Sequence, residues 1–170
     1  MTAPSSTNTR MLSLAGLGAG AFLLAGHDQS TLVLVRLTIC GATLAAVSAS
    51  DLAEHRIPNR LVLPAAVACA VLSVIAGVPA NDLLAGGAIV VLLALVSLTW
   101  PRALGMGDVK LALLVLAGLD GSAIRALVLG LILAALAGAS VIARHGISAG
   151  RRTLPLAPFI AAGSLLALLT

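Results

Sequence analysis

The sequence contains few charged residues. Asp, Glu, Lys and Arg make up only 9% of its 170 residues, whereas apolar residues make up 60%. A soluble globular domain usually carries about 25% charged residues. The apolar residues also form long continuous blocks, and about 20 such residues suffice to cross a bilayer as a helix. The composition therefore excludes an ordinary soluble domain and predicts an all-α, polytopic transmembrane helical bundle with six or seven spans.

Cysteine and aromatic residues are also scarce. The two cysteines, Cys40 and Cys69, lie inside apolar blocks and form no CxxC pair. This pattern excludes a zinc ribbon and argues against a disulfide framework, so we expect no metal site and no cofactor. Tyrosine is absent, and the aromatic residues are Phe22, Trp100 and Phe159. The aromatic belt that usually marks membrane interfaces is therefore nearly missing.

The chain divides into a polar tail and one apolar domain. Residues 1–10 are rich in Ser and Thr and are expected to be disordered, while residues 11–170 are expected to form a single transmembrane domain. The apolar blocks run over 11–26, 32–50, 61–78, 83–100, about 108–119, 123–143 and 154–169. The first block is short and follows a basic residue, so a cleaved signal peptide is the alternative to a span there.

The basic residues indicate the orientation of the bundle. If the loop 51–60 is cytoplasmic, eight of the ten basic residues fall on the cytoplasmic side, and the other two are Arg36 and Arg125. The eight are Arg10, Arg56, Arg60, Arg102, Lys110, Arg144, Arg151 and Arg152. Such an excess follows the positive-inside rule, so the net charge of +4 does not indicate nucleic-acid binding. We expect a multi-pass protein of the inner, cytoplasmic membrane that contacts lipid.

The six acidic residues are the candidates for chemistry, because ionisable residues at the edge of a span are often functional. Asp28, Asp82 and Asp120 lie in short outer loops, where turn formation explains them. Glu54 is interpreted as a solvated loop charge, with a substrate contact as the alternative. Asp51 follows nineteen almost uncharged residues at the cytoplasmic boundary. An interfacial anchor and a functional carboxylate explain Asp51 equally well when it is considered alone.

Asp108 follows two glycines, Gly105 and Gly107, which free the backbone just before it. It opens a short apolar block, where the helix dipole favours a carboxylate. An N-cap aspartate is the plain alternative. Lys110 stands where the last glycine of a dinucleotide-binding GxGxxG motif would be, so the segment does not match that motif.

Asp51 and Asp108 are separated by two spans and therefore return to the same side of the membrane. Two carboxyl groups that converge in a poorly solvated site can share one proton, as aspartic proteolysis requires. Between them, Pro58 ends any preceding helix and extends Ile57. Asn59 is then the expected N-cap of the next helix.

These residues resemble the type IV prepilin leader peptidases, which are GxGD-type membrane aspartic proteases. The first matching stretch is Asp51-Leu52-Ala53-Glu54-His55-Arg56-Ile57-Pro58-Asn59, and the second is Gly105-Met106-Gly107-Asp108-Val109-Lys110-Leu111. The segment 154–159 resembles a later Pro-Phe-Gly-Pro-Phe motif in part, with Leu156 and Ala157 substituted. The resemblance covers residues 32–165. Presenilin-like proteases share the GxGD motif, but their other aspartate follows a tyrosine, which this chain lacks.

The resemblance implies that Asp51 and Asp108 form a catalytic dyad, supported by Ile57, Pro58, Asn59, Gly105, Gly107 and Lys110. It also implies the substrate, a prepilin or pilin-like protein whose basic leader is cut at the cytoplasmic face. Larger members carry a cytoplasmic insertion, often with CxxC motifs, and methylate the new amino terminus. Only nine residues separate Asp51 from the next block here, so the chain resembles the compact, peptidase-only members.

Two other classes of function remain open at this point. A small proton-coupled transporter would also carry membrane acids, although it favours acids near the midplane. A non-catalytic membrane protein of pilus assembly is the other alternative, and retention of both aspartates argues against it.

Overall fold

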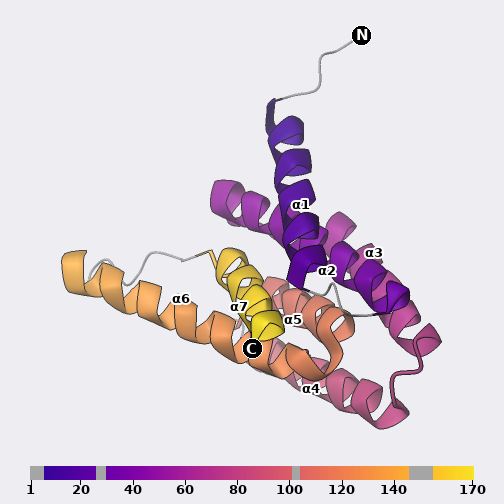
Figure 1. The fold of residues 1–170 in the computed structure, drawn as a ribbon. Coiled ribbons are helices and arrows are strands. Elements are labelled where there is room, and N and C mark those ends of the chain that lie inside the picture. Colours follow the sequence, from indigo (N-terminus) through magenta and orange to yellow (C-terminus); the bar gives the residue numbers. More distant parts are fainter. Residues whose placement is uncertain (1–5, 26–29, 101–103, 146–154) are drawn as a thin grey trace.

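The computed structural model describes residues 6–25, 30–100, 104–145 and 155–170, which form helices and their connections (Figure 1). The helices are α1 (Ser6–Ala25), α2 (Thr31–Glu54), α3 (Asn59–Ile75), α4 (Ala80–Thr99), α5 (Met106–Leu119), the 3-10 turn η1 (Asp120–Ser122), α6 (Ala123–His145) and α7 (Ala157–Leu169). No strand occurs within these described ranges. The expected all-α fold is confirmed.

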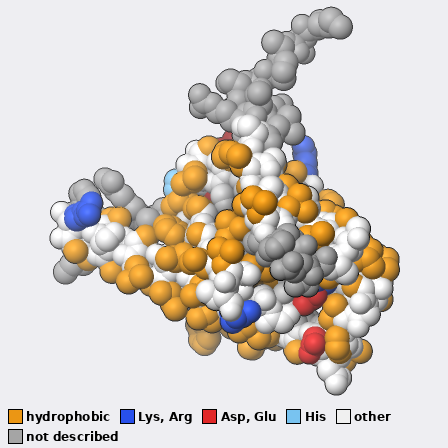
Figure 2. Space-filling view, in the orientation of Figure 1, with side chains coloured by type: hydrophobic (Ala, Val, Ile, Leu, Met, Phe, Trp, Pro, Cys, Tyr) orange, Lys and Arg blue, Asp and Glu red, His pale blue; other side chains and the backbone are white. Residues whose placement is uncertain are grey.

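Three helical stretches are long and apolar enough to cross a membrane: Thr31–Glu54, Ala80–Thr99 and Met106–Arg144. The last contains α5, η1 and α6. Shorter apolar helices cover Ser13–Leu24, Asn59–Ile75 and Ala157–Leu169. Apolar side chains cover much of the face seen in Figure 2, as lipid contact requires. The chain is thus a membrane protein, while the count of six or seven spans stays a prediction.

The core lies where α2, α3 and α5 meet. Its largest fully buried side chains include Leu44, Val62, Leu114 and Val115, and both cysteines are buried among them. Helix α4 packs against α5, yet Ser97 is its only buried residue. This distribution makes α4 a peripheral helix with most of its surface available to lipid.

Small residues bring the outer helices close to the core. A Cβ on Gly18 of α1 would lie only 2.4 Å from the Ala45 Cβ of α2. A Cβ on Gly163 of α7 would lie 2.3 Å from the Gly130 backbone nitrogen of α6. Close backbone approach at small residues is how membrane helices associate, because burial among lipid-like side chains provides little force. These close approaches hold α1 against α2 and α7 against α6.

Two expectations about local structure were wrong. Residues 6–10 are not disordered but open α1, since Ser, Thr and Asn are compatible with a helix start and an apolar run follows directly. Residues 1–5 lie outside the described residues. Asn59 is not the N-cap of α3 but its first helical residue, because Pro58 takes the extended N-cap conformation.

Candidate functional site

The structure places Asp51 and Asp108 at the same end of the bundle. Asp51 lies in the last turn of α2, and Asp108 is the third residue of α5. The two helices run antiparallel, since Arg36 near the start of α2 pairs with Asp120 directly after the end of α5, while Asp51 at the end of α2 lies near Asp108 at the start of α5. The two carboxyl groups are close enough for their charges to interact. The convergence expected from counting spans is therefore present.

Asp51 is buried, with 6% of its surface exposed. Its carboxyl Oδ2 accepts a hydrogen bond of 2.9 Å from the backbone N–H of Ala157, at the start of α7. A carboxylate in the last turn of a helix faces the negative end of the helix dipole, whereas the start of a helix attracts it. The Asp51 carboxylate is therefore stabilised by the start of α7, whereas its own helix, α2, disfavours a negative charge at this position. Sequence reasoning missed this partner, although the incomplete motif at 154–159 contains it.

Asp108 lies in the first turn of α5, with Gly105 rather than Asp108 as the N-cap. Its backbone N–H donates to the Gly105 carbonyl over 3.0 Å. A Cβ on Gly105 would lie 3.5 Å from the Asp108 Oδ2, so the carboxyl group folds back over this glycine. The position at the helix start favours the carboxylate.

The two aspartate motifs contact each other directly. A Cβ on Gly107 would lie 2.9 Å from the Ile57 Cδ1, so the isoleucine packs on the bare glycine backbone. The Lys110 Nζ donates a hydrogen bond of 2.7 Å to the Asn59 Oδ1. These two contacts join the segment after Asp51 to the first turns of α5. Gly105 lies beside the Asp108 carboxyl group, and Pro58 is the N-cap of α3, while the supporting role of these residues stays a prediction.

The comparison with protein families decides where this arrangement belongs. The model of the type IV leader peptidase family matches residues 38–143, a range that contains both aspartate motifs. The chain belongs to the type IV leader peptidase family. No curated protein and no solved structure matches the chain. The resemblance noted in the sequence is thus confirmed, and membership of a peptidase family implies a protease.

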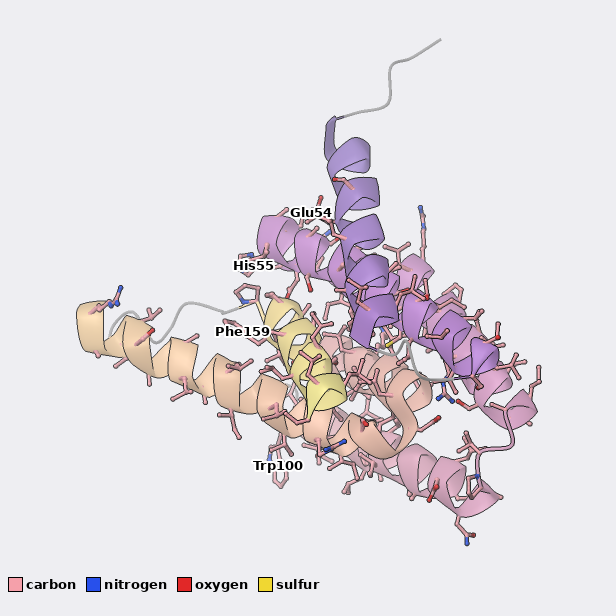
Figure 3. The ribbon with its side chains drawn as sticks, viewed as in Figure 1. Glu54, His55, Trp100 and Phe159 are labelled. Atoms are coloured by element: carbon pink, nitrogen blue, oxygen red, sulfur yellow. The ribbon has the colours of Figure 1, made fainter. Side chains whose placement is uncertain are left out.

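Around the aspartates of this leader peptidase family member, several polar residues are exposed. Glu54 ends α2, and His55 follows it in a left-handed conformation with φ of 51°. Figure 3 labels both on the side of the molecule where α7 begins, near Phe159. Helix α2 thus ends just beyond Asp51, which lets the chain turn toward Ile57. Both side chains are available to a bound molecule.

Asp82 and Asp120 do not belong to the two aspartate motifs and lie at the other ends of their helices. Asp82 is exposed in the first turn of α4, and Asp28 lies outside the described residues. Asp120 has φ of 42°, as its interpretation as a turn residue suggests. Its carboxylate, however, also forms an ion pair with Arg36, so it does more than form a turn.

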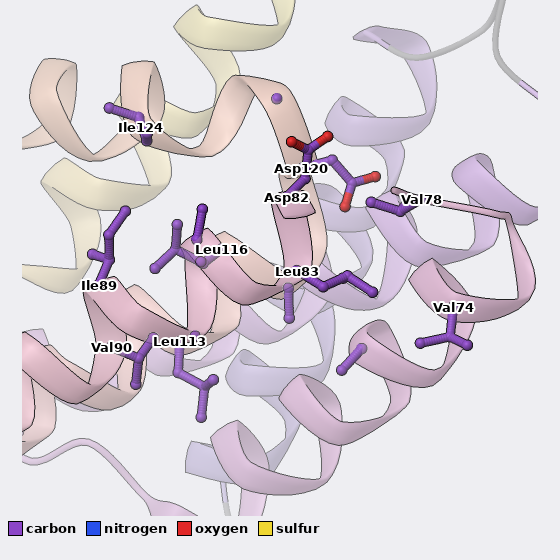
Figure 4. A pocket seen from close by; sticks show the side chains of 16 residues that line it. Val74, Val78, Asp82, Leu83, Ile89, Val90, Leu113, Leu116, Asp120 and Ile124 are labelled. Atoms are coloured by element: carbon purple, nitrogen blue, oxygen red, sulfur yellow. The ribbon is translucent and has the colours of Figure 1, made fainter. Parts of the chain in front are cut away.

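One sizeable cavity lies away from the aspartates. It has a volume of about 480 Å³ and lies between α3, α4, α5 and α6, with mostly apolar walls and with Asp82 and Asp120 at one end (Figure 4). No residue of the two aspartate motifs lines it. Within the described ranges, no group of three or more His, Cys, Asp or Glu side chains could hold a metal ion.

Proposed function

We propose that the chain is a membrane aspartic endopeptidase that removes the leader peptide of a prepilin or pilin-like protein. The observation that carries the proposal is the meeting of Asp51 and Asp108, each at a helix end, within a chain of the leader peptidase family. Hydrolysis of a peptide bond by two carboxyl groups needs no cofactor, and the proposal includes none.

In the proposed reaction, Asp51 and Asp108 act as one unit. The mechanism requires the pair to share one proton, because two carboxyl groups that meet closely do not both ionise readily. The ionised carboxylate removes a proton from water, which attacks the scissile carbonyl. The protonated carboxyl group polarises that carbonyl and later gives its proton to the leaving amine. The burial of Asp51 keeps bulk water away from this exchange.

The surroundings of the pair support an extended peptide as substrate. Gly105 and Met106 are exposed beside Asp108, and glycine lets another backbone approach closely. On the other side, Leu52 and Glu54 are exposed beside Asp51. The substrate's apolar helix stays in lipid while its leader reaches the pair from the membrane surface.

We place this reaction at the cytoplasmic face of the cell membrane. Arg56 and Arg60 lie in the segment that follows Asp51, and Lys110 lies one half-turn after Asp108. Basic residues next to spans favour the cytoplasmic side. They serve orientation in the lipid here, and no nucleic acid is involved.

The proposal is tested by cleavage in membranes. We would co-express the chain with a prepilin from the same genome and measure the fraction that loses its leader. Asp51→Asn and Asp108→Asn keep the size of each side chain and remove its charge, so each should abolish cleavage while the protein still inserts. Asp82→Asn, an exposed acid in the first turn of α4, is the matched control and should cleave normally.

Two results would contradict the proposal. Normal cleavage by either dyad variant would remove that aspartate from the mechanism. A wild-type chain that cleaves no prepilin would instead favour an assembly protein or a proton-coupled transporter, and proton flux would then be measured.

A further inference from the structure

A second polar cluster lies at the opposite end of the helices that carry the aspartates. Arg36 of α2 is buried, with 3% of its surface exposed. Its Nη1 donates to the Ser73 Oγ of α3 over 2.7 Å, and its Nη2 forms an ion pair with the Asp120 Oδ2. The Ser73 hydroxyl lies 3.1 Å from the Ala117 carbonyl and 3.3 Å from the Asp120 Oδ1. One guanidinium group therefore ties three helices together.

Helices α2 and α3 each carry one residue of this cluster and one residue of the candidate site, and Asp120 directly follows α5, which carries Asp108. In α2, Arg36 and Asp51 are fifteen residues apart, or about 22 Å along a helix. In α3, Ser73 and Asn59 are fourteen residues apart, or about 21 Å. Asp120 follows Asp108 by twelve residues, or about 18 Å. A helix transmits an axial shift along its whole length, so the position of one end fixes that of the other.

The contacts among α2, α3 and α5 in the middle of the bundle do little to fix how far each helix is shifted along its axis relative to the others, which is the axial register. They consist mainly of apolar side chains such as Leu44, Val47, Leu111 and Leu114. Such contacts have no direction, and lipid is as apolar as the side chains themselves. A buried charged group has one good arrangement, and selecting a helix register is the best attested use of such groups.

We propose that Arg36, Ser73 and Asp120 are positioning residues that fix the axial register of α2, α3 and α5. This register sets the separation of the Asp51 and Asp108 carboxyl groups at the far end. The inference that catalysis depends on this cluster rests on the proposed function, whereas the register itself can be measured without any cleavage.

The test removes both charges of the ion pair together. Arg36→Met with Asp120→Asn nearly keeps the side-chain volumes, and Asn has the same shape as the Asp that already adopts the backbone conformation of residue 120. Replacing both members of a buried ion pair leaves no unpaired charge, so the chain should still fold. Arg125→Met with Asp82→Asn is the matched control, since it removes the same charges from the same end. The Arg125 Nη2 donates to the Ser122 Oγ on the adjacent turn.

An engineered disulfide reports the register. A Cβ on Gly107 would lie 3.5 Å from the Ile57 Cβ, within the range of about 3.5–4.5 Å found across disulfides. The Ile57→Cys/Gly107→Cys protein should therefore cross-link rapidly under mild oxidation. The Arg36→Met/Asp120→Asn change should slow this reaction severalfold, and the control change should leave it alone. Single-cysteine versions account for reaction with the buried Cys40 and Cys69.

Kinetics of the proteins without added cysteines provide the second readout. A misplacement approaching 1 Å costs up to about 100-fold in rate, so the Arg36→Met/Asp120→Asn variant should lose about tenfold or more in kcat. KM should barely change, because the cluster does not touch the substrate. A general loss of folded protein would instead lower the concentration of active enzyme. Measuring that concentration by titration of the active sites distinguishes this loss from a lower kcat.

The outcomes distinguish the inference from the proposed function. If the folded Arg36→Met/Asp120→Asn protein cross-links and cleaves like the control, the inference is overturned. If this variant does not insert, Ser73→Ala replaces it, since both charges remain. Slower cross-linking of Ser73→Ala supports the register, and unchanged cross-linking overturns it. If wild type never cleaves while cross-linking still depends on the cluster, the register stands and the peptidase proposal fails.

Discussion

Gly118 of α5 packs directly against Cys40 of α2, and replacing this glycine with alanine tests that packing. A Cβ at this position would lie 2.5 Å from the Cys40 Sγ and 2.8 Å from the Cys40 Cβ. Carbon atoms in contact prefer about 3.5–4.0 Å. A rotation of the Cys40 side chain moves the sulfur but not the Cβ, so the two helices must separate.

Two opposite effects determine the result of Gly118→Ala. Alanine is a better helix former than glycine by about 0.8–1.0 kcal/mol. Overpacking of a close-packed core costs about 1–3 kcal/mol, and contact with a fixed Cβ places this site in the upper part of that range. We therefore expect Gly118→Ala to lower the free energy of unfolding by about 1–2 kcal/mol.

The effect of Gly118→Ala on the free energy of unfolding should change from destabilising to stabilising when the clash with Cys40 is removed. Cys40→Gly deletes both atoms that the new methyl group meets, so Gly118→Ala should stabilise the Cys40→Gly protein by up to about 1 kcal/mol. Unfolding of the four proteins of this cycle would be followed by circular dichroism in detergent micelles. A Gly118→Ala protein as stable as wild type, or the same effect in both backgrounds, would refute the close packing of α2 and α5.

Two further changes test other contacts. Asn59→Ala and Lys110→Met each remove the hydrogen bond between the aspartate motifs, so each should lower the cleavage rate. The double variant should lose no more activity than the more damaging single variant. Additive losses would show that the two side chains act separately. Gly163→Ala places a methyl group 2.3 Å from the Gly130 backbone nitrogen, which cannot rotate away. The yield of folded protein should therefore fall sharply. A normal yield on size-exclusion chromatography would contradict the tight α6–α7 contact.

The convergence of the aspartates could be predicted because it depends only on counting spans. Asp51 and Asp108 end and begin apolar blocks separated by two crossings, and no knowledge of side-chain direction is required. The Gly107 contact with Ile57 was foreseen only as backbone freedom before Asp108. Its partner lies fifty residues away, and nothing in a single sequence pairs the two.

The other polar contacts could not be predicted for physical reasons. The helices are apolar all round, so no hydrophobic face tells which way Arg36 points or that it meets Asp120. The partner of Asp51 is a backbone N–H at Ala157, and a backbone donor has no residue signature. Pro158 lies in the first turn of α7, as is common for proline at a helix start. The N-cap of α3 was misplaced by one residue because Pro58 itself adopts the extended conformation.

The central claim is that Asp51 and Asp108 together hydrolyse the substrate, and its most direct test uses purified protein in lipid vesicles. A purified prepilin would be added with no other protein, and single-turnover rates measured for wild type, Asp51→Asn, Asp108→Asn and the double variant. The account predicts rapid cleavage by wild type and equally low rates for the three variants, because residues that act as one unit are not additive. A double variant much slower than each single one, or a single variant near the wild-type rate, would contradict it.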